Sequence, residues 1–131
     1  MSPQKASDFT RQLCEMAPVI PVLVVDDTNV AKPLAQALVA GGLPVLEVTL
    51  RTPNALDVIR EMSTVEGSIV GAGTVLNSAD ALAAKDAGAT FAVSPGATPS
   101  LMDACEELAL PLLPGAATAT EAMALLERGY S

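Results

Sequence analysis

Short apolar runs alternate with longer Ala-rich amphipathic segments along the whole chain. Each apolar run follows a Gly or a Pro, and a loop rich in Gly, Pro, Ser or Thr comes after it. Such runs are typical of buried strands, and the segments between them have the spacing of amphipathic helices. Successive runs lie 25, 24, 22 and 21 residues apart, which is the space that a strand, a helix and two short loops occupy. Five strands are therefore expected, around Ile20, Val45, Ile69, Phe91 and Leu112.

This alternation predicts an α/β fold with a parallel sheet and right-handed crossovers, in one domain that covers residues 1–131. An additional helix is expected before the first strand, from about Ser7 to Met16. Two architectures fit the pattern. One is a parallel (β/α)8 TIM-barrel type truncated to about five βα units, since a complete barrel takes about 250 residues and a further strand is expected after Gly129. The other is an open five-stranded sheet with helices on both faces, as in flavodoxin-like domains, which is complete at this length.

Capping residues mark where the helices begin and end. Thr52 followed by Pro53 predicts a helix start, because a hydroxyl can cap the helix and proline fits its first turn. Asn77 or Ser78 predicts another start in the same way. Glycines that follow an amphipathic segment predict helix ends, because they adopt the left-handed conformation readily. These are Gly41-Gly42, Gly88 and Gly129.

The composition favours a globular protein with an aliphatic core. Half of the residues are hydrophobic, but the chain has no Trp, one Tyr and two Phe. Its net charge of −8 argues against nucleic acid or an anionic membrane as a partner, because both require clustered Lys and Arg. The N-terminus lacks a basic segment followed by an uninterrupted apolar stretch, so the protein is expected to be cytoplasmic.

The residue types that are present limit the chemistry. The chain contains no His, which removes His-based triads, His metal sites and the usual proton shuttle. Cys14 and Cys105 are far apart, so no metal site is expected and both are interpreted as reduced core thiols. No dinucleotide or P-loop glycine pattern is present, and Gly71 and Gly73 are interpreted as tight-turn residues. Acid-base chemistry therefore falls to carboxylates, Lys or Tyr.

One carboxylate, Glu47, stands in the middle of a predicted buried strand. An ionised carboxylate there is costly unless it is paired, hydrogen-bonded or shifted in pKa, and a shifted carboxylate is what proton transfer uses. The alternative is structural, with Glu47 paired to Thr49 or to a basic residue of a neighbouring strand. Because side chains two apart share a face, the strand has one apolar face and one that becomes more polar toward its carboxyl end. The apolar face comprises Leu46, Val48 and Leu50, and the other face comprises Val45, Glu47, Thr49 and Arg51.

Six segments of the chain carry a resemblance to a known family. They are IPVLVV (20–25), ALVAGG (37–42), LEVTLRT (46–52), VGAGTVL (70–76), SPG (94–96) and PLLPG (111–115). Their order and spacing resemble those of the 2-keto-3-deoxy-6-phosphogluconate / 4-hydroxy-2-oxoglutarate aldolase family, over nearly the whole chain. The resemblance implies a (β/α)8 barrel that forms a homo-oligomer, usually a trimer. It also implies a lyase that cleaves its substrate reversibly to pyruvate and an aldehyde through a lysine Schiff base, without a cofactor.

The resemblance implies roles for four residues. Glu47 matches the family's general acid/base, which moves protons through a water in the carbinolamine and enamine steps. Arg51 and Thr74 match residues that hold the carboxylate end of the keto acid, and the planar fork of an arginine suits that contact. Pro95 matches a position in the wall of the pocket. The partner that these residues imply is a small keto acid, such as pyruvate or a phosphorylated sugar acid.

The resemblance also indicates what the chain lacks. The family's Schiff-base lysine lies on the sixth strand, in a Phe-Lys-x-Phe-Pro type segment expected a few residues after Gly129. The three lysines of this sequence are Lys5 near the N-terminus and Lys32 and Lys85 in predicted helices, and none follows a strand. The chain is therefore expected to be the N-terminal portion of an aldolase and to be inactive alone. The alternative function is a non-catalytic half-barrel scaffold or assembly module that closes its open edge against another copy.

Overall fold

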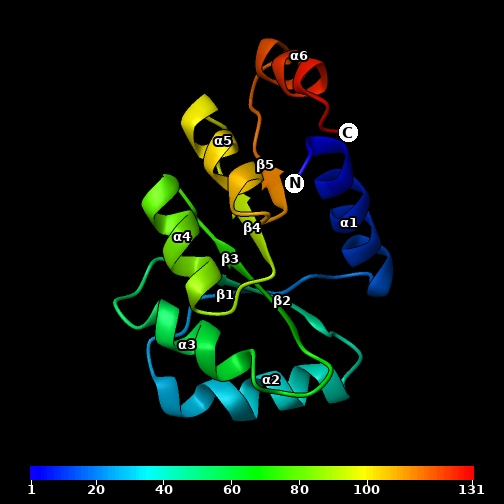
Figure 1. The fold of residues 1–131 in the computed structure, drawn as a ribbon. Coiled ribbons are helices and arrows are strands. Elements are labelled where there is room, and N and C mark those ends of the chain that lie inside the picture. The colour runs from blue at the N-terminus through cyan, green and yellow to red at the C-terminus, as the bar shows by residue number, and fades with distance from the viewer.

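The structure, a computed structural model, describes residues 1–131, and its strands and helices alternate as the sequence predicts (Figure 1). The strands are β1 (Val22–Leu23), β2 (Val45–Thr49), β3 (Ile69–Gly73), β4 (Phe91–Ser94) and β5 (Leu112–Pro114). The helices are α1 (Pro3–Met16), α2 (Ala31–Ala40), α3 (Ala55–Met62), α4 (Ser78–Asp86), α5 (Pro99–Glu107) and α6 (Ala119–Arg128), with a 3-10 turn, η1 (Thr28–Val30), before α2. None of these helices combines the length and the apolar composition that crossing a membrane requires.

The strands form one parallel sheet in chain order, β1-β2-β3-β4-β5. A flavodoxin-like sheet has the order 2-1-3-4-5, with its first strand inside the sheet. Here β1 lies at one edge and β5 at the other, so the open-sheet alternative is wrong and the barrel-type architecture is confirmed. Sequential right-handed crossovers place the connecting helices on one face, and α2 to α5 lie along that face while α1 lies on the opposite side (Figure 1).

Two separate clusters of apolar side chains pack on the two faces of the sheet. The larger cluster joins Leu46 and Val48 of β2 to the inward sides of α2 to α5, which confirms the predicted apolar face of this strand. The smaller cluster consists of Leu13, Val45 and Phe91, all fully buried. The face of the sheet that points away from α2 to α5 is called the inner face. Because Leu13 belongs to α1, this helix covers the inner face at the amino-terminal end of β2. The face that carries Glu47 is therefore the one that α1 partly covers.

Most of the predicted helix boundaries are confirmed. The side chain of Asn77 caps α4, since its Oδ1 accepts a hydrogen bond of 2.9 Å from the amide of Asp80. Gly129 caps α6 in the left-handed conformation, with φ of 104°. Gly42 and Gly88 also adopt positive φ, just after α2 and α4.

The predicted start of α3 at Thr52-Pro53 is wrong. The helix begins at Ala55 with Asn54 at its N-cap. The Thr52 hydroxyl instead donates a hydrogen bond of 3.0 Å to the carbonyl of Val25, in the loop after β1. The Thr52 hydroxyl, which the local sequence pattern assigns to the cap of α3, is thus used in a contact between the loops that follow β1 and β2.

The interpretation of both cysteines as core thiols is correct for one of them. Cys105 is buried among the side chains between α5 and the sheet, and this burial raises the pKa of its thiol to about 11. Cys14 is exposed. It follows Leu13 on α1, and one step along a helix turns the side chain by about 100° away from the sheet that Leu13 contacts.

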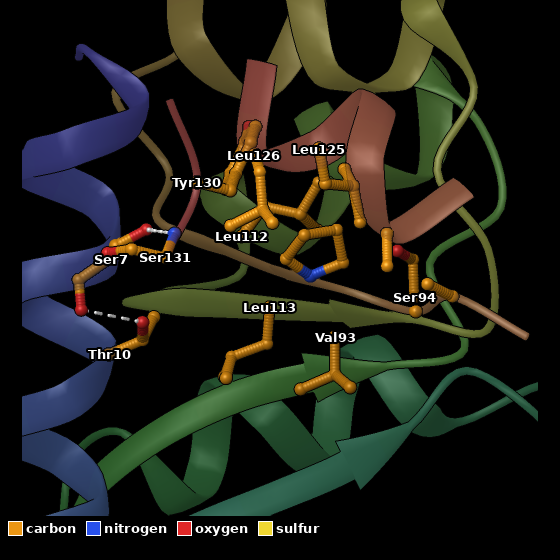
Figure 2. Close-up of a pocket in the computed structure, with 14 residues that line it drawn as sticks. Ser7, Thr10, Val93, Ser94, Leu112, Leu113, Leu125, Leu126, Tyr130 and Ser131 are labelled. Carbon is orange, nitrogen blue, oxygen red and sulfur yellow. Dashed lines mark hydrogen bonds between the residues drawn. The ribbon is translucent and has the colours of Figure 1, made fainter. Parts of the chain in front are cut away.

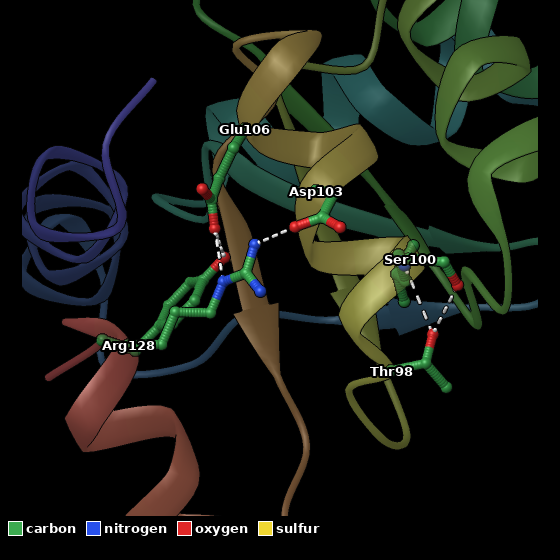
Figure 3. Close-up of polar contacts among 7 residues, drawn as sticks. Thr98, Ser100, Asp103, Glu106 and Arg128 are labelled. Atoms are coloured by element: carbon green, nitrogen blue, oxygen red, sulfur yellow. Dashed lines mark hydrogen bonds and ion pairs between the residues drawn. The ribbon is translucent and has the colours of Figure 1, made fainter.

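The C-terminal helix α6 has no buried residue, and besides Leu125, which packs on the core, it is held by ionic and polar contacts. Arg128 at its end pairs with Asp103 and Glu106 of α5, and its Nε lies 2.8 Å from Glu106 Oε1 (Figure 3). The buried Tyr130 hydroxyl lies 3.5 Å from the same Glu106 oxygen. A partly buried arginine shared between two carboxylates therefore fixes the end of α6 against α5.

The two edges of the sheet are open and apolar. Val22 and Val24, in and just after β1, expose 59% and 60% of their surface. The other edge of the sheet is β5. There, a groove of about 520 Å³ lies between β5, α1 and α6, and its lining is mainly apolar (Figure 2). We call it the β5 groove, and its lining includes Thr10, Val93, Leu113, Leu125, Leu126 and Tyr130. Unpaired strand edges with apolar surroundings are surfaces on which another chain segment can pair.

The seating of α1 on the inner face gives a first prediction. Leu13→Ala should lower the free energy of unfolding by about 2–5 kcal/mol, because it leaves a cavity beside Val45 and Phe91. Met16→Ala on the same helix is the matched control, since Met16 is 50% exposed and its loss should cost less than about 0.5 kcal/mol. Urea unfolding followed by circular dichroism measures both, and equal losses would show that α1 is not packed on the sheet.

Candidate active site

Glu47 lies on the inner face of β2, where the alternation of the strand places it. Its neighbours Leu46 and Val48 are fully buried against the helices, so the side chain of Glu47 points the other way and is half-buried. The carboxylate lies over the last residue of β3, Gly73: a Cβ added to Gly73 would stand 2.0 Å from Glu47 Oε1. The carboxylate is thereby held near the carboxyl end of the sheet, where parallel sheets form their sites.

The Glu47 carboxylate has neither a hydrogen bond nor an ion pair within the chain. The structural alternative of a pair with Thr49 does not occur, because the Thr49 hydroxyl donates a hydrogen bond of 3.1 Å to the carbonyl of Leu23. Burial raises the pKa of Glu47 above its ordinary value of 4.5, and the nearby positive charge of Arg51 opposes this in part. A half-buried carboxyl without a partner and with a raised pKa is able to hold and release a proton.

Arg51 and Thr74 come together at the same edge of the sheet. Arg51 follows β2 and is exposed, and Thr74 follows β3. The Arg51 Nε donates a hydrogen bond of 3.3 Å to Thr74 Oγ1. Arg51 has no carboxylate partner within the chain, so the terminal nitrogens of its guanidinium remain available to an anion. This is an arrangement that can receive a carboxylate with two hydrogen bonds.

Thr74 has an unusual backbone conformation that the sequence gives no sign of. Its φ is +60°, which is rare for a β-branched residue and costs of order 1–3 kcal/mol. The flanking strands hold it there, because the Leu50 amide bonds the Gly73 carbonyl at 2.9 Å and the Val75 amide bonds the Val93 carbonyl at 3.1 Å. Strain of this kind is concentrated at functional sites, where the surrounding structure imposes it.

Pro95 lies at the same edge one strand beyond β3, in the exposed loop after β4. The backbone of Gly115, after β5, approaches it closely: a Cβ on Gly115 would stand 2.4 Å from the Pro95 carbonyl oxygen. The structure therefore joins Arg51 to Thr74 directly and sets Glu47 beside Gly73. Pro95 shares the edge of the sheet with them and belongs to a separate loop contact.

The interpretation of Gly71 and Gly73 as turn residues is wrong. Both lie within β3, both are buried, and neither has the positive φ of a turn glycine. Glycine is required at both positions because other side chains occupy the space above them. A Cβ on Gly71 would stand 2.3 Å from the Phe91 ring, and one on Gly73 would meet Glu47. The sequence signal was the spacing of two, which puts both glycines on the inner face.

No amine lies in this site. Lys5, Lys32 and Lys85 are exposed on α1, α2 and α4, and Lys32 pairs with Glu61 at 3.1 Å. No group of three His, Cys, Asp or Glu side chains that could hold a metal ion is present. The β5 groove contains one titratable side chain, Tyr130, and burial raises the pKa of its phenol to about 12. The unpaired Glu47 carboxyl and the Arg51–Thr74 pair thus lie together toward the carboxyl ends of β2 and β3.

Comparisons with known proteins agree with this architecture. The chain matches the family model described as KDPG and KHG aldolase over residues 10–131. A 2-dehydro-3-deoxy-phosphogluconate aldolase from Zymomonas mobilis is 54% identical over 114 residues, which make up 87% of this chain and 55% of that protein.

Two solved structures extend the match to three dimensions. One is the 2-keto-3-deoxy-6-phosphogluconate aldolase of Zymomonas mobilis ZM4 with 3-phosphoglycerate, with a TM-score of 0.90 at 49% identity over 95% of this chain and 59% of that chain. The other is the KDPG aldolase of Legionella pneumophila with pyruvate captured as a covalent carbinolamine, with a TM-score of 0.84 at 44% identity over 90% of this chain and 58% of that chain. The chain spans a little over half the length of these relatives, and it belongs to the KDPG and KHG aldolase family.

Proposed function

We propose that this chain supplies the proton-transfer and carboxylate-binding part of an aldolase site. The activity is that of a lyase, which cleaves 2-keto-3-deoxy-6-phosphogluconate or 4-hydroxy-2-oxoglutarate reversibly to pyruvate and an aldehyde. The observation that carries the proposal is the half-buried Glu47 carboxyl, which has no partner and a raised pKa. The names of the relatives support it, since they are phosphogluconate aldolases and one holds pyruvate as a covalent carbinolamine.

Glu47 is the proposed general acid and base. When the carbon-carbon bond of an iminium-bound substrate breaks, the hydroxyl of the departing aldehyde loses a proton and the electron pair moves to the iminium, giving an enamine. The enamine carbon then takes a proton, and hydrolysis of the resulting imine releases pyruvate. A carboxyl whose pKa burial has raised is suited to accept the first proton and return the second, directly or through one water.

Arg51 and Thr74 are the proposed binding groups for the carboxylate of the keto acid. The Arg51 Nε is engaged by Thr74 Oγ1, which orients the guanidinium and leaves its terminal nitrogens for the ligand. A bidentate contact fixes the plane of the carboxylate and therefore the position of the adjacent keto carbon. We assign Pro95 to the wall of the proposed substrate site, because its loop follows β4 at the same edge of the sheet.

The nucleophile is proposed to come from outside residues 1–131. A Schiff-base lysine requires a lowered pKa, which burial or a neighbouring cation provides. Lys5, Lys32 and Lys85 are exposed on helices, and Lys32 has an acidic partner. The relatives extend well beyond the matched region, so turnover is expected to need a segment that carries the lysine. We therefore propose that these 131 residues alone do not turn over substrate.

A second candidate function is that of a non-catalytic half-barrel that assembles with another copy. The observation that favours it is the pair of open, apolar edges: Val22 and Val24 at β1, and the β5 groove at the other edge. A parallel strand placed in the groove would cover Leu113 and Leu126, and an exposed β1 is such a strand. The net charge of −8 opposes association of two copies, so the apolar contact would have to outweigh that repulsion.

A chimera tests the aldolase proposal. It joins residues 1–131 to the part of the Zymomonas mobilis relative beyond the match, and it should release pyruvate from 2-keto-3-deoxy-6-phosphogluconate in a coupled assay free of host aldolase. Glu47→Gln should lower kcat by about 10²- to 10⁴-fold, the usual share of general acid-base catalysis. Arg51→Leu should act mainly on KM, because it removes binding.

Trapping with pyruvate and borohydride completes this test. The chimera should gain one pyruvate adduct by intact mass, and the 131-residue chain should gain none. An adduct on Lys5, Lys32 or Lys85 of the chain alone would overturn the assignment of the nucleophile to another segment. A folded chimera in which Glu47→Gln leaves kcat unchanged would overturn the role of Glu47.

The raised pKa of Glu47 predicts how stability depends on pH. As the pH rises above 4.5, the unfolded chain releases the Glu47 proton while the folded chain retains it, so this group lowers stability increasingly until its folded pKa is passed. Glu47→Gln removes this loss of stability, because the glutamine side chain does not titrate. The free energy of unfolding of the variant, relative to the parent, should therefore be higher at about pH 8 than at about pH 4.

Urea unfolding at several pH values measures this difference. Glu66→Gln is the control, because it makes the same chemical change at an exposed position in the loop between α3 and β3. If the difference for Glu47→Gln varies with pH no more than that for Glu66→Gln, the Glu47 carboxyl is not desolvated, and its proposed role as a general acid loses its support.

Light scattering tests the assembly candidate. Self-association through the β5 groove predicts a mass that rises with concentration and falls back to the monomer on Leu126→Asp, since Leu126 lines the groove and is 63% exposed. Leu82→Asp, on α4 and outside the groove, is the control and should leave the mass unchanged. A monomer over the whole concentration range would reject this candidate.

A further inference from the structure

We infer that Gly73 is a positioning residue for Glu47, because its missing side chain leaves the space over β3 that the Glu47 carboxylate fills. The register pairs Thr49 with Gly73 and Glu47 with Gly71, so the Glu47 side chain leans along the sheet toward the carboxyl end of β3. A Cβ on Gly73 would stand 2.0 Å from Oε1, 2.8 Å from Cδ and 3.0 Å from Cγ of Glu47. The three atoms nearest to that Cβ all belong to this one side chain.

The backbone gives no other reason for a glycine here. The glycines with positive φ are Gly42, Gly67, Gly88 and Gly129, and Gly73 is not among them. Alanine could therefore adopt the backbone conformation of residue 73 without strain. What excludes alanine is the position of the carboxylate, and an alanine would displace that carboxylate.

Gly71 provides the contrast on the same face of the same strand. A Cβ there would stand 2.3 Å from two atoms of the Phe91 ring, which is fully buried and has no room to move. The Glu47 side chain is flexible and half-buried, so it can move away from an alanine at 73 at small cost. Gly71 is thus a packing residue, whereas Gly73 sets where a polar group lies.

The position so defined is next to the anion-binding groups. Gly73 precedes Thr74, whose hydroxyl accepts the Arg51 hydrogen bond, and Arg51 is the charged group that acts on Glu47. A carboxylate seated over Gly73 is therefore adjacent to the Arg51–Thr74 pair. The catalytic consequence of this placement rests on the proposed function, but the placement itself does not.

The carboxyl pKa of Glu47 reports the placement directly. It is measured by ¹³C NMR titration of the 131-residue chain, with Glu47→Gln to assign the signal. Gly73→Ala should bring this pKa back toward 4.5, because the carboxyl leaves its buried position. Gly71→Ala should lower Tm markedly and leave the Glu47 pKa in place. An unchanged Glu47 pKa in a folded Gly73→Ala variant would overturn the inference.

A double-mutant cycle gives a second readout that needs no titration. Gly73→Ala should raise Tm more in a Glu47→Ala background than in the parent, because the atoms that the new Cβ meets are gone while the lower chain entropy of alanine remains. The same change in both backgrounds would overturn the inference. Neither measurement uses substrate, so the two proposals can fail separately. An inactive chimera, together with a double-mutant cycle in which the two substitutions are coupled, would reject only the aldolase role. A cycle in which the two substitutions are additive would reject the placement of Glu47 over Gly73, whether or not the chimera is active.

Discussion

The alternation of side chains along β2 is the constraint on which the rest of the molecule depends. Leu46 and Val48 must face α2 to α5, because the larger apolar cluster is built around them. The same pleat then turns Glu47 to the inner face, which α1 covers only at its amino-terminal end through Leu13. A slip of one residue would bury the carboxylate among the helices and expose two core residues. The packing of the core thus fixes the location of the site.

The two glycines of β3 complete this arrangement by leaving room on the inner face. Gly71 and Gly73 offer no side chains, so neighbouring strands fill the space above them. From β4 comes the Phe91 ring, which belongs to the core, and from β2 comes the Glu47 carboxylate, which belongs to the site. The middle of β3 therefore makes room for a core side chain, and its end makes room for the carboxylate of the site. The transition from core to site takes place within two residues of the same strand.

The sequence predicted the number of strands, their order of appearance and the inward-facing Glu47, because periodicity and burial determine them locally. The repeat pattern alone left open the choice between barrel and open sheet, since strand order depends on contacts that no local pattern records, and the family resemblance indicated the barrel. The sequence pattern misplaced the start of α3, where the Thr52 hydroxyl bonds Val25 in another loop. It also gave no sign of the positive φ of Thr74, which only the flanking strand contacts impose. Sites that depend on such long-range contacts are recognised from structure.

Charge distribution links the site residues to one another. In a chain with seven Lys and Arg against fifteen Asp and Glu, Arg51 bonds a threonine and has no acidic partner. Its positive charge also works against the burial that raises the pKa of Glu47. Under the proposed function, a keto-acid carboxylate on Arg51 would neutralise that charge and remove the opposing effect. Binding of the substrate would then raise the pKa of Glu47 further and make its carboxylate a stronger base for the proton that the substrate hydroxyl releases.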